Sequence, residues 1–443
     1  MSIADLIKSI NSIDGNQLKK VKQDQRAELS RACRKLLGLC ELPVEKTYHL
    51  LFSTYQAIVL RLAIDIKLFD AVRMRTRGRI DYVTVEQIAS DTQVQAALVA
   101  RIMLFLSSMG LLERDSAQRD TYRKTSLTQA YLSETGLSQA VIHFTHLQSF
   151  VTRLPEYFKN RGFKNPCGKT GTPCQQSLTV NMNYLEYLSK NPYYLRANYS
   201  VMNTFWICKE PWYQIYPIQE NVINTFLPIV TEVSRNLLFA YGSNPYHAAF
   251  SGTPINQTVF NYRIFLVNIG GDGKHLQSFA QRFQMLPGVV VHLSPVPKVI
   301  PGGSNRIEVL PFHFFSTPII TGAKLYMLYG FLHDWPDHTA ISILHGVGSA
   351  MSSDSVLLVV ERVVLDEVVE MMDAVEDWSA MVCSASKVRT KADIESMLRN
   401  ANFVVTSSWT GHPDDIVMSR TGMETGMKLM IFEARRMEVI HSR

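Results

Sequence analysis

The chain has 443 residues, of which 46% are hydrophobic and 19% charged, and its formal net charge is +6. This composition supports a large core and excludes a globally disordered chain, and the length predicts two or three domains. The basic residues are scattered, which argues against a nucleic-acid-binding protein because electrostatic binding needs a clustered patch.

The N-terminus and the cysteines indicate the cellular setting. The first residues are amphipathic and lack the apolar centre of a signal peptide, and no apolar run reaches the roughly 18 residues of a membrane span. The six cysteines show no Cys-x-x-Cys pair and no Cys/His grouping with zinc spacing. We therefore expect a cytoplasmic protein with free thiols, no membrane span and no bound metal.

The first part of the chain is predicted to be helical. Apolar residues recur at helical spacing through residues 1–40 and again from Val44 to Val72. Thr84 followed by Gln87 has the pattern of a capping box, which predicts that a helix opens there.

A helix-turn-helix with a wing is predicted next. Its second helix runs from about Ala96 to Met109, and short strands are expected at 111–113 and 121–123. A helix that reads DNA needs an exposed polar face, but this one is apolar on most sides and has one arginine. We therefore expect it to be buried and structural.

Residues 135–240 are predicted to be mostly helical and are rich in aromatic residues and methionine. This stripe is either ordinary core or the wall of an apolar pocket.

From residue 263 onward, short apolar strands alternate with helices, which predicts an α/β fold with a parallel, doubly wound, Rossmann-like sheet. Ligands of such sheets bind at the carboxyl ends of the strands. The predicted strands are Arg263–Ile269, Val289–Leu293, Lys324–Tyr329 and Val356–Val360, and the predicted helices lie at 275–284, 337–351 and 391–400.

Residues 331–337 read Phe-Leu-His-Asp-Trp-Pro-Asp and resemble the Leu-His-Asp-Trp-x-Asp signature of small-molecule O-methyltransferases of plants and fungi. Residues 356–361 resemble the strand that follows this signature and ends in a carboxylate. Residues 387–390, with 401–403, are similar to the Lys-Glu-Arg-Thr and Ala-Gly-Phe segment of the family. The resemblance covers about residues 45–435.

The resemblance implies that the chain is divided into three parts. Residues 1–135 would form a helical, winged-helix dimerisation domain, and residues 136–245 a helical region that lines the substrate pocket. Residues 246–443 would form the Rossmann-like catalytic domain. A homodimer that binds a hydrophobic small molecule is therefore expected.

The resemblance also implies a catalytic site. In the family a histidine takes the proton from a substrate hydroxyl, and this role falls on His333, with Glu361 orienting its ring. Asp334 either points into the site or caps the following helix. Val388 replaces the second orienting carboxylate of the family. Four further residues lie where the family roofs or lines its pocket, although core or solvated positions are open alternatives for the histidines: His143, His146, Asn203 and Trp206.

The cofactor loop departs from the family pattern. The family binds S-adenosylmethionine with a loop that reads Asp-x-Gly-Gly-Gly-x-Gly, whereas residues 268–274 read Asn-Ile-Gly-Gly-Asp-Gly-Lys. Gly270 and Gly271 are retained, but Asp272 brings a side chain to a place where the backbone must approach the cofactor. His292 stands where the family has the acid that holds the ribose hydroxyls. We therefore expect no cofactor, or S-adenosylmethionine if methyl transfer is retained.

Some fungal members of this family are pericyclases, which dehydrate an alcohol and guide a Diels–Alder, hetero-Diels–Alder or Alder-ene step. This chemistry needs a shaped apolar pocket, a proton donor and positioning. The sequence thus favours a pericyclase of fungal secondary metabolism that acts on a polyketide-type intermediate. A methyltransferase that uses S-adenosylmethionine on a small-molecule hydroxyl is the first alternative, and a non-catalytic partner subunit is the second.

Overall fold

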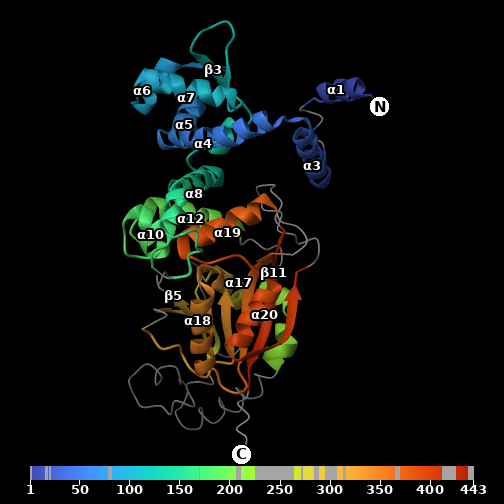
Figure 1. Ribbon diagram of the computed structural model, residues 1–443, viewed down its shortest axis with the longest axis vertical. Helices are drawn as coiled ribbons and strands as arrows, with labels where there is room; N and C mark the ends of the chain where they lie inside the picture. Colours follow the sequence, from blue (N-terminus) through green and yellow to red (C-terminus); the bar gives the residue numbers. More distant parts are fainter. Residues whose placement is uncertain are drawn as a thin grey trace, which may run out of the picture. The chain divides into compact units, whose positions relative to one another are not determined.

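The computed structural model divides into two compact units, residues 1–145 and 146–443 (Figure 1). None of the described helices combines the length and the hydrophobicity that a membrane span requires. The described residues are 2–14, 18, 21–77, 82–168, 170–205, 211–224, 264–270, 273–283, 289–294, 307–312, 316–364, 370–411 and 426–437.

The described residues at the start of the first unit are mostly helical, as the apolar spacing predicted. The helical stretch predicted from Val44 to Val72 forms two helices, because Lys67 adopts a left-handed backbone conformation (φ 56°) between them. The helices are α1 (Ile3–Asn11), α3 (Gln23–Cys40), α4 (Pro43–Asp65) and α5 (Leu68–Arg75).

The predicted helix-turn-helix and wing are present. The Oγ1 atom of Thr84 accepts from the backbone N–H of Gln87, and the Gln87 side chain accepts from the N–H of Thr84, so the capping box is confirmed. The second helix buries four apolar side chains, as expected of a structural helix. The sheet gains a strand that was not predicted, in the order β1-β3-β2. The elements are β1 (Tyr82–Thr84), α6 (Val85–Thr92), α7 (Ala96–Ser108), β2 (Leu112–Arg114), β3 (Thr121–Lys124) and η1 (Thr128–Tyr131).

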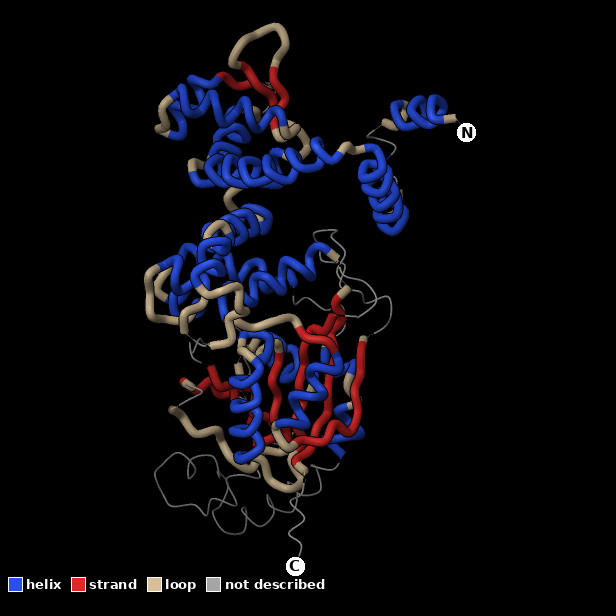
Figure 2. The backbone as a smooth tube through the Cα atoms, viewed as in Figure 1, coloured by secondary structure: helices blue, strands red, loops and turns tan. Residues whose placement is uncertain are grey.

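The aromatic-rich region is mostly helical through residue 224, as predicted, and the rest of that prediction lies outside the described residues. Its helices are short, and two of them open with a proline (Figure 2). They are α8 (Gly136–Val151), α9 (Leu154–Asn160), α10 (Pro173–Leu178), α11 (Tyr184–Ser189), α12 (Pro192–Phe205), α13 (Trp212–Ile215) and the π-helix η2 (Gln219–Ile223).

The second unit contains the predicted doubly wound sheet. Five neighbouring strands, from β6 to β8, run parallel in the order β6-β5-β4-β7-β8. The chain moves outward from β4 in one direction and from β7 in the other, so the switch point of the sheet lies between these two strands. The strands are β4 (Ile264–Ile269), β5 (Val289–Ser294), β6 (Ile307–Pro311), β7 (Leu325–Tyr329) and β8 (Val356–Val364).

The sheet is mixed, whereas the sequence predicted a parallel one. β10 (Phe403–Thr410) and β11 (Met427–Arg436) extend it beyond β8 as an antiparallel pair, and the two-residue β9 (Arg389–Thr390) adds to β8. These strands, β6 and helix α19 (Met371–Ser384) were not predicted.

Side chains of the central strands alternate between two cores, as the two-residue period of a strand requires. One core packs against α18 (Asp337–Ala350) and α20 (Lys391–Asn400), and the other against α13 and α17 (Lys274–Arg282). Burial on both faces explains why β4, β7 and β8 read as continuous apolar runs. The loops at their carboxyl ends are therefore held on a rigid support.

Candidate active site

The loop with the signature residues leaves the carboxyl end of β7, at the switch point of the sheet. It contains the single 3-10 turn η3 (Leu332–Asp334). In the neighbouring strand β8, Val360 pairs with Tyr329, so Glu361 lies one residue beyond the end of β7. The register of two buried strands therefore brings Glu361 to the loop.

Glu361 binds the loop through both of its carboxylate oxygens. Oε2 lies 3.2 Å from Nδ1 of His333, and Oε1 accepts the backbone N–H groups of Phe331 at 2.8 Å and Leu332 at 2.5 Å. Burial raises the pKa of Glu361, but the charge and hydrogen bond of His333 and the two N–H groups outweigh it and lower the pKa below its usual range. The side chain, which is 2% exposed, is thus a buried carboxylate.

His333 lies between two carboxylates. Its Nε2 atom is 3.5 Å from Oδ1 of Asp334, while Nδ1 faces Glu361. Burial alone would lower the pKa of His333, but the charges of Asp334 and Glu361 raise it to about 9. The imidazole is therefore protonated at neutral pH, and its side chain remains 31% exposed.

Asp334 faces His333 and does not cap the following helix. Pro336 occupies the N-cap of α18. Burial raises the pKa of Asp334, although the charge of His333 opposes this shift. Of the two alternatives for this residue, the geometry favours the one that points toward the histidine.

A hydrogen-bonded network lies at the end of β4, where the cofactor cradle was expected. Asn268 is buried, and its Nδ2 donates to the carbonyl of Gly270 at 3.0 Å and lies 3.0 Å from Nδ1 of His292. Its Oδ1 lies 3.1 Å from Nε2 of His275, whose ring stacks on Tyr329 with centroids 4.0 Å apart. The amide of Asn268 is thus engaged through both of its ends.

The ring of Phe331 covers Gly270. This glycine has a φ of 79°, and a Cβ atom placed on it would lie 2.2 Å from Cδ2 of Phe331. Asn268 and His292 stand where the resemblance implies acids, so the described residues place an amide and an imidazole at these two positions. Gly271 and Asp272 lie outside the described residues.

His146 is buried in an aromatic cluster of the second unit. Its ring stacks on Tyr194 with centroids 3.8 Å apart and meets the edge of Phe150 at 4.8 Å. Tyr184 belongs to the same cluster. Helix α10 at this cluster packs on α19, which in turn packs on η3.

Cys383 on α19 connects this cluster with the histidine loop. Burial raises its pKa well above the usual value, and the charges of Cys174 and Asp334 add to the shift. Burial raises the pKa of Tyr184 as well, and the charge of Cys383 adds to that shift. Helix α19 thus contacts both the helix at this cluster and the loop that carries His333.

The other predicted pocket residues are described only in part. His143 is buried in the first unit, where its ring meets the edge of Phe144 at 5.1 Å. Asn203 lies on α12, but its side chain is not described, and Trp206 lies outside the described residues. Their roles remain predictions.

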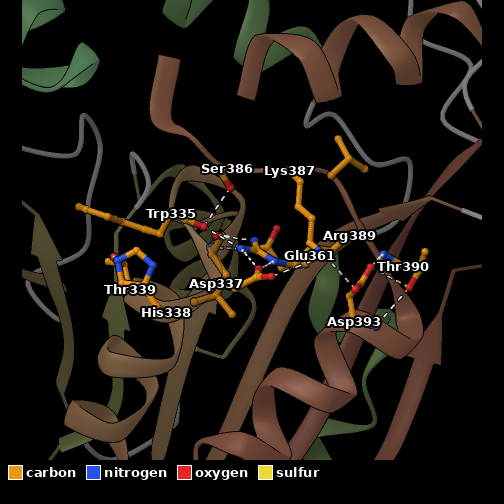
Figure 3. A network of polar contacts seen from close by, with 12 residues as sticks. Trp335, Asp337, His338, Thr339, Glu361, Ser386, Lys387, Arg389, Thr390 and Asp393 are labelled. Atoms are coloured by element: carbon orange, nitrogen blue, oxygen red, sulfur yellow. Dashed lines mark hydrogen bonds and ion pairs between the residues drawn. The ribbon is translucent and has the colours of Figure 1, made fainter. Parts of the chain in front are cut away.

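Two residues that the sequence analysis did not select also hold the loop. Arg389 and Asp337 belong to a polar network around it, which Figure 3 shows. The Lys-x-Arg-Thr segment was the signal in the sequence, but its pattern gives no indication that the arginine reaches the loop. No group of three His, Cys, Asp or Glu side chains among the described residues could hold a metal ion.

Comparison with known proteins agrees with this fold. The family model of the O-methyltransferase dimerisation domain matches residues 48–134, and that of the O-methyltransferase domain matches residues 219–404. The chain belongs to the O-methyltransferase family. Both parts of this family's architecture, the helical dimerisation domain and the catalytic sheet, are therefore present.

Individual members of the O-methyltransferase family match almost the whole chain. The O-methyltransferase mpaG of Penicillium brevicompactum is 25% identical over 92% of this chain and 96% of its own length. The solved structure of LepI in complex with SAM has a TM-score of 0.68 at 18% identity and covers 97% of this chain and 100% of its own. A structure described as a pericyclic reaction enzyme has a TM-score of 0.67 at 18% identity, covering 97% and 99%. These structural likenesses show the fold.

Proposed function

We propose that this member of the O-methyltransferase family is a pericyclase that uses His333 as a proton donor on a hydrophobic, polyketide-type intermediate and needs no S-adenosylmethionine. The observation that carries the proposal is the position of His333 between two carboxylates. A general base must be neutral to accept a proton, and with a pKa of about 9 roughly one imidazole in a hundred is neutral at pH 7. The geometry favours an acid over a base.

The proposed reaction needs only what this site holds. In a dehydration, His333 gives a proton to the leaving hydroxyl, the C–O bond breaks, and its electron pair leaves with water. The proton that the substrate loses elsewhere returns to the imidazole. The cyclisation that follows rearranges bonds within the substrate, and a hydrogen bond from His333 to a substrate carbonyl lowers its barrier by stabilising developing negative charge.

The cofactor side of the site supports the same proposal. Asn268 is bonded to His292 and to the carbonyl of Gly270, and neither side chain offers the carboxylate that would hold ribose hydroxyls. The ring of Phe331 fills the open side of Gly270. One of the similar solved structures is described as a pericyclic reaction enzyme, so the fold accommodates such chemistry.

An O-methyltransferase dependent on S-adenosylmethionine is the second candidate. The similar proteins favour it, since mpaG is named an O-methyltransferase and the LepI structure contains SAM. Methyl transfer would need the neutral form of His333 as the base, with Glu361 orienting its ring. The two candidates differ in the product, because methyl transfer adds one carbon and dehydration removes one water.

The deciding experiment measures the mass of the product. The substrate is the intermediate that accumulates when the gene is deleted, and it is incubated with purified protein with and without added S-adenosylmethionine. We expect a dehydrated or isomeric product at the same rate in both samples. A product heavier by one methyl group, formed only when the cofactor is added, would establish the methyltransferase instead.

We also propose that the protein is a homodimer whose N-terminal helices pack on the partner. Most large apolar side chains of α4 are exposed in the single chain, and the only buried residues of this helix are Ala63 and Ile64 near its end. Such a surface is unfavourable in water unless a partner covers it. The match to the dimerisation domain supports a second copy as that partner. The exposed side chains include Leu50, Leu51, Phe52, Tyr55, Ile58 and Leu62.

A further inference from the structure

Arg389 reaches the histidine loop from a strand edge. It lies in β9 and pairs with Val363, two residues beyond Glu361 on β8. Its side chain is 2% exposed. Nη1 donates to the carbonyl of Leu332 at 2.7 Å, and Nη2 donates to the carbonyl of Trp335 at 2.6 Å (Figure 3). The guanidinium thus bonds to the residues on either side of the His333–Asp334 pair.

Two buried charges of opposite sign hold the two peptide groups that flank Leu332. Glu361 accepts the N–H of Leu332, while Arg389 binds the carbonyl of that residue. The carbonyl of Trp335 also accepts the hydroxyl of Ser386 at 2.9 Å. Because a buried charge without partners is costly, each of these groups strongly favours the loop conformation that satisfies it.

Asp337 orients the guanidinium. Its Oδ1 accepts from Nε of Arg389 at 3.0 Å and from Nη2 at 2.8 Å. This fork leaves Nη1 and Nη2 directed at the two carbonyls. Lysine carries the same charge but has a single nitrogen, so it cannot bind both carbonyls and the carboxylate in this plane.

We propose that Arg389 is a positioning residue for His333: it fixes the carbonyl groups on both sides of the His333–Asp334 pair and so holds the imidazole against Glu361. The inference rests on the proposed function in one respect, namely that His333 is the reacting group. Arg389 acts through the backbone of the loop.

Charged groups surround the loop, so a variant that tests the role of Arg389 must leave the local charge unchanged. An exchange of Arg389 for lysine keeps the local charge and removes the fork, so a change at His333 reports the geometry. Among the described residues, several ionisable groups face the loop. They are Asp334 and Asp337 on its own segment, Glu361 and Arg362 on β8, Cys383 on α19, Lys387 before β9 and Arg389 within it.

The test follows the titration of His333 in the substrate-free protein, through the pH dependence of C2-proton exchange read by mass spectrometry. In Arg389→Lys we expect the midpoint to fall by about one pH unit or more, since the ring is no longer held at Glu361. The matched control is Arg61→Lys, which changes a guanidinium bonded to Asp65 and the carbonyl of Ile142 in the other unit. Its midpoint should equal that of the native protein.

A second variant decides the matter if Arg389→Lys does not fold. Asp337→Glu alters a side chain that is 52% exposed, keeps its charge and displaces the anchor of the guanidinium. We expect a smaller fall of the midpoint in the same direction. An unchanged midpoint in folded Arg389→Lys, or in Asp337→Glu if the first variant is unfolded, would overturn the proposal.

Turnover then separates this inference from the proposed function. With substrate, Arg389→Lys should lower kcat by about 10- to 100-fold and leave KM nearly unchanged, because a group displaced by about 1 Å loses that much rate. If His333→Ala turned over at the native rate while Arg389→Lys still moved the midpoint, the function would be wrong and the positioning role would stand.

Discussion

The imidazole of His333 and the carboxylate of Glu361, which lie 28 residues apart in the chain, meet at 3.2 Å because β7 and β8 are adjacent parallel strands. Glu361 contributes both a charge and a backbone clamp to this pair. The charge favours the protonated histidine, and the two hydrogen bonds to backbone N–H groups fix the position of the loop that carries it.

His333→Ala should reduce turnover by about 10²–10⁴-fold and leave fold and assembly intact, because one positioned proton donor contributes about that much. Lysine at this position should retain part of the activity, since it still donates, and glutamine should retain less. Steady-state kinetics with the native substrate measure the series, with His345→Ala, an exposed histidine on α18, as the control. If lysine proves no better than alanine, the histidine acts as a base.

Glu361→Gln should weaken the fall of the melting temperature, Tm, as the pH rises into the alkaline range. The pKa of His333 is raised from 6.5 to about 9, so its ion pair stabilises the fold fully below pH 6.5 and is lost as the pH rises through 9. The native Tm should therefore fall across this window, and the Tm of the variant should fall less. Glutamine can still accept the two N–H groups, which keeps the loop in place.

Thermal melts between pH 6 and 9.5 measure this difference. Glu433→Gln is the control, because Glu433 is a buried carboxylate that accepts from Tyr216 on the other side of the sheet. This control should keep the native slope. Parallel curves for Glu361→Gln and the native protein would show that the two groups are not coupled in solution.

The sequence predicted those helices and strands that have a clear local pattern of capping residues or apolar spacing. The capped helix at Thr84 and the helix over 391–400 were predicted almost to the residue, because capping and periodicity are local properties. β10 was not predicted, since its alternation of apolar and polar residues is weak and only one of its side chains is buried. Helix α19 was also missed, because its N-cap is Glu370 and not the usual Ser, Thr, Asn or Asp.

The site was predicted as far as its motif extended. The pairing of His333 with Glu361 followed from the resemblance, and the strand register explains it. The role of Asp334 could not be decided from the sequence, because a residue just before a helix can either cap that helix or point into the site. The contact of Arg389 with the loop depends on β9 joining β8, and two residues are too few for a strand pattern.

Calorimetry should show no low-micromolar binding of S-adenosylmethionine to the native protein, because Asn268 and His292 replace acids. The double variant Asn268→Asp, His292→Asp should gain about tenfold in affinity if one charge-assisted hydrogen bond to the ribose is restored. Tight binding by the native protein would favour the methyltransferase.

Light scattering at micromolar concentration should show a dimer. Leu51→Glu, on the exposed face of α4, should shift it toward a monomer, since a buried charge at an interface is unfavourable. Leu185→Glu changes a side chain of similar exposure on α11 and should leave the dimer intact. A native protein that is monomeric at this concentration would contradict the expected assembly.

The contact between Phe331 and Gly270 limits which substitutions the protein can accept at these two positions. A side chain at position 270 would collide with the ring, so no substitution there is accessible while phenylalanine remains at 331. A smaller residue at position 331 would remove the ring from Gly270. Because Gly270 also has a φ of 79°, which favours glycine whatever the space, a library that randomises position 270 alone should return glycine. A library that randomises both positions should still return glycine at 270 and a range of residues at 331.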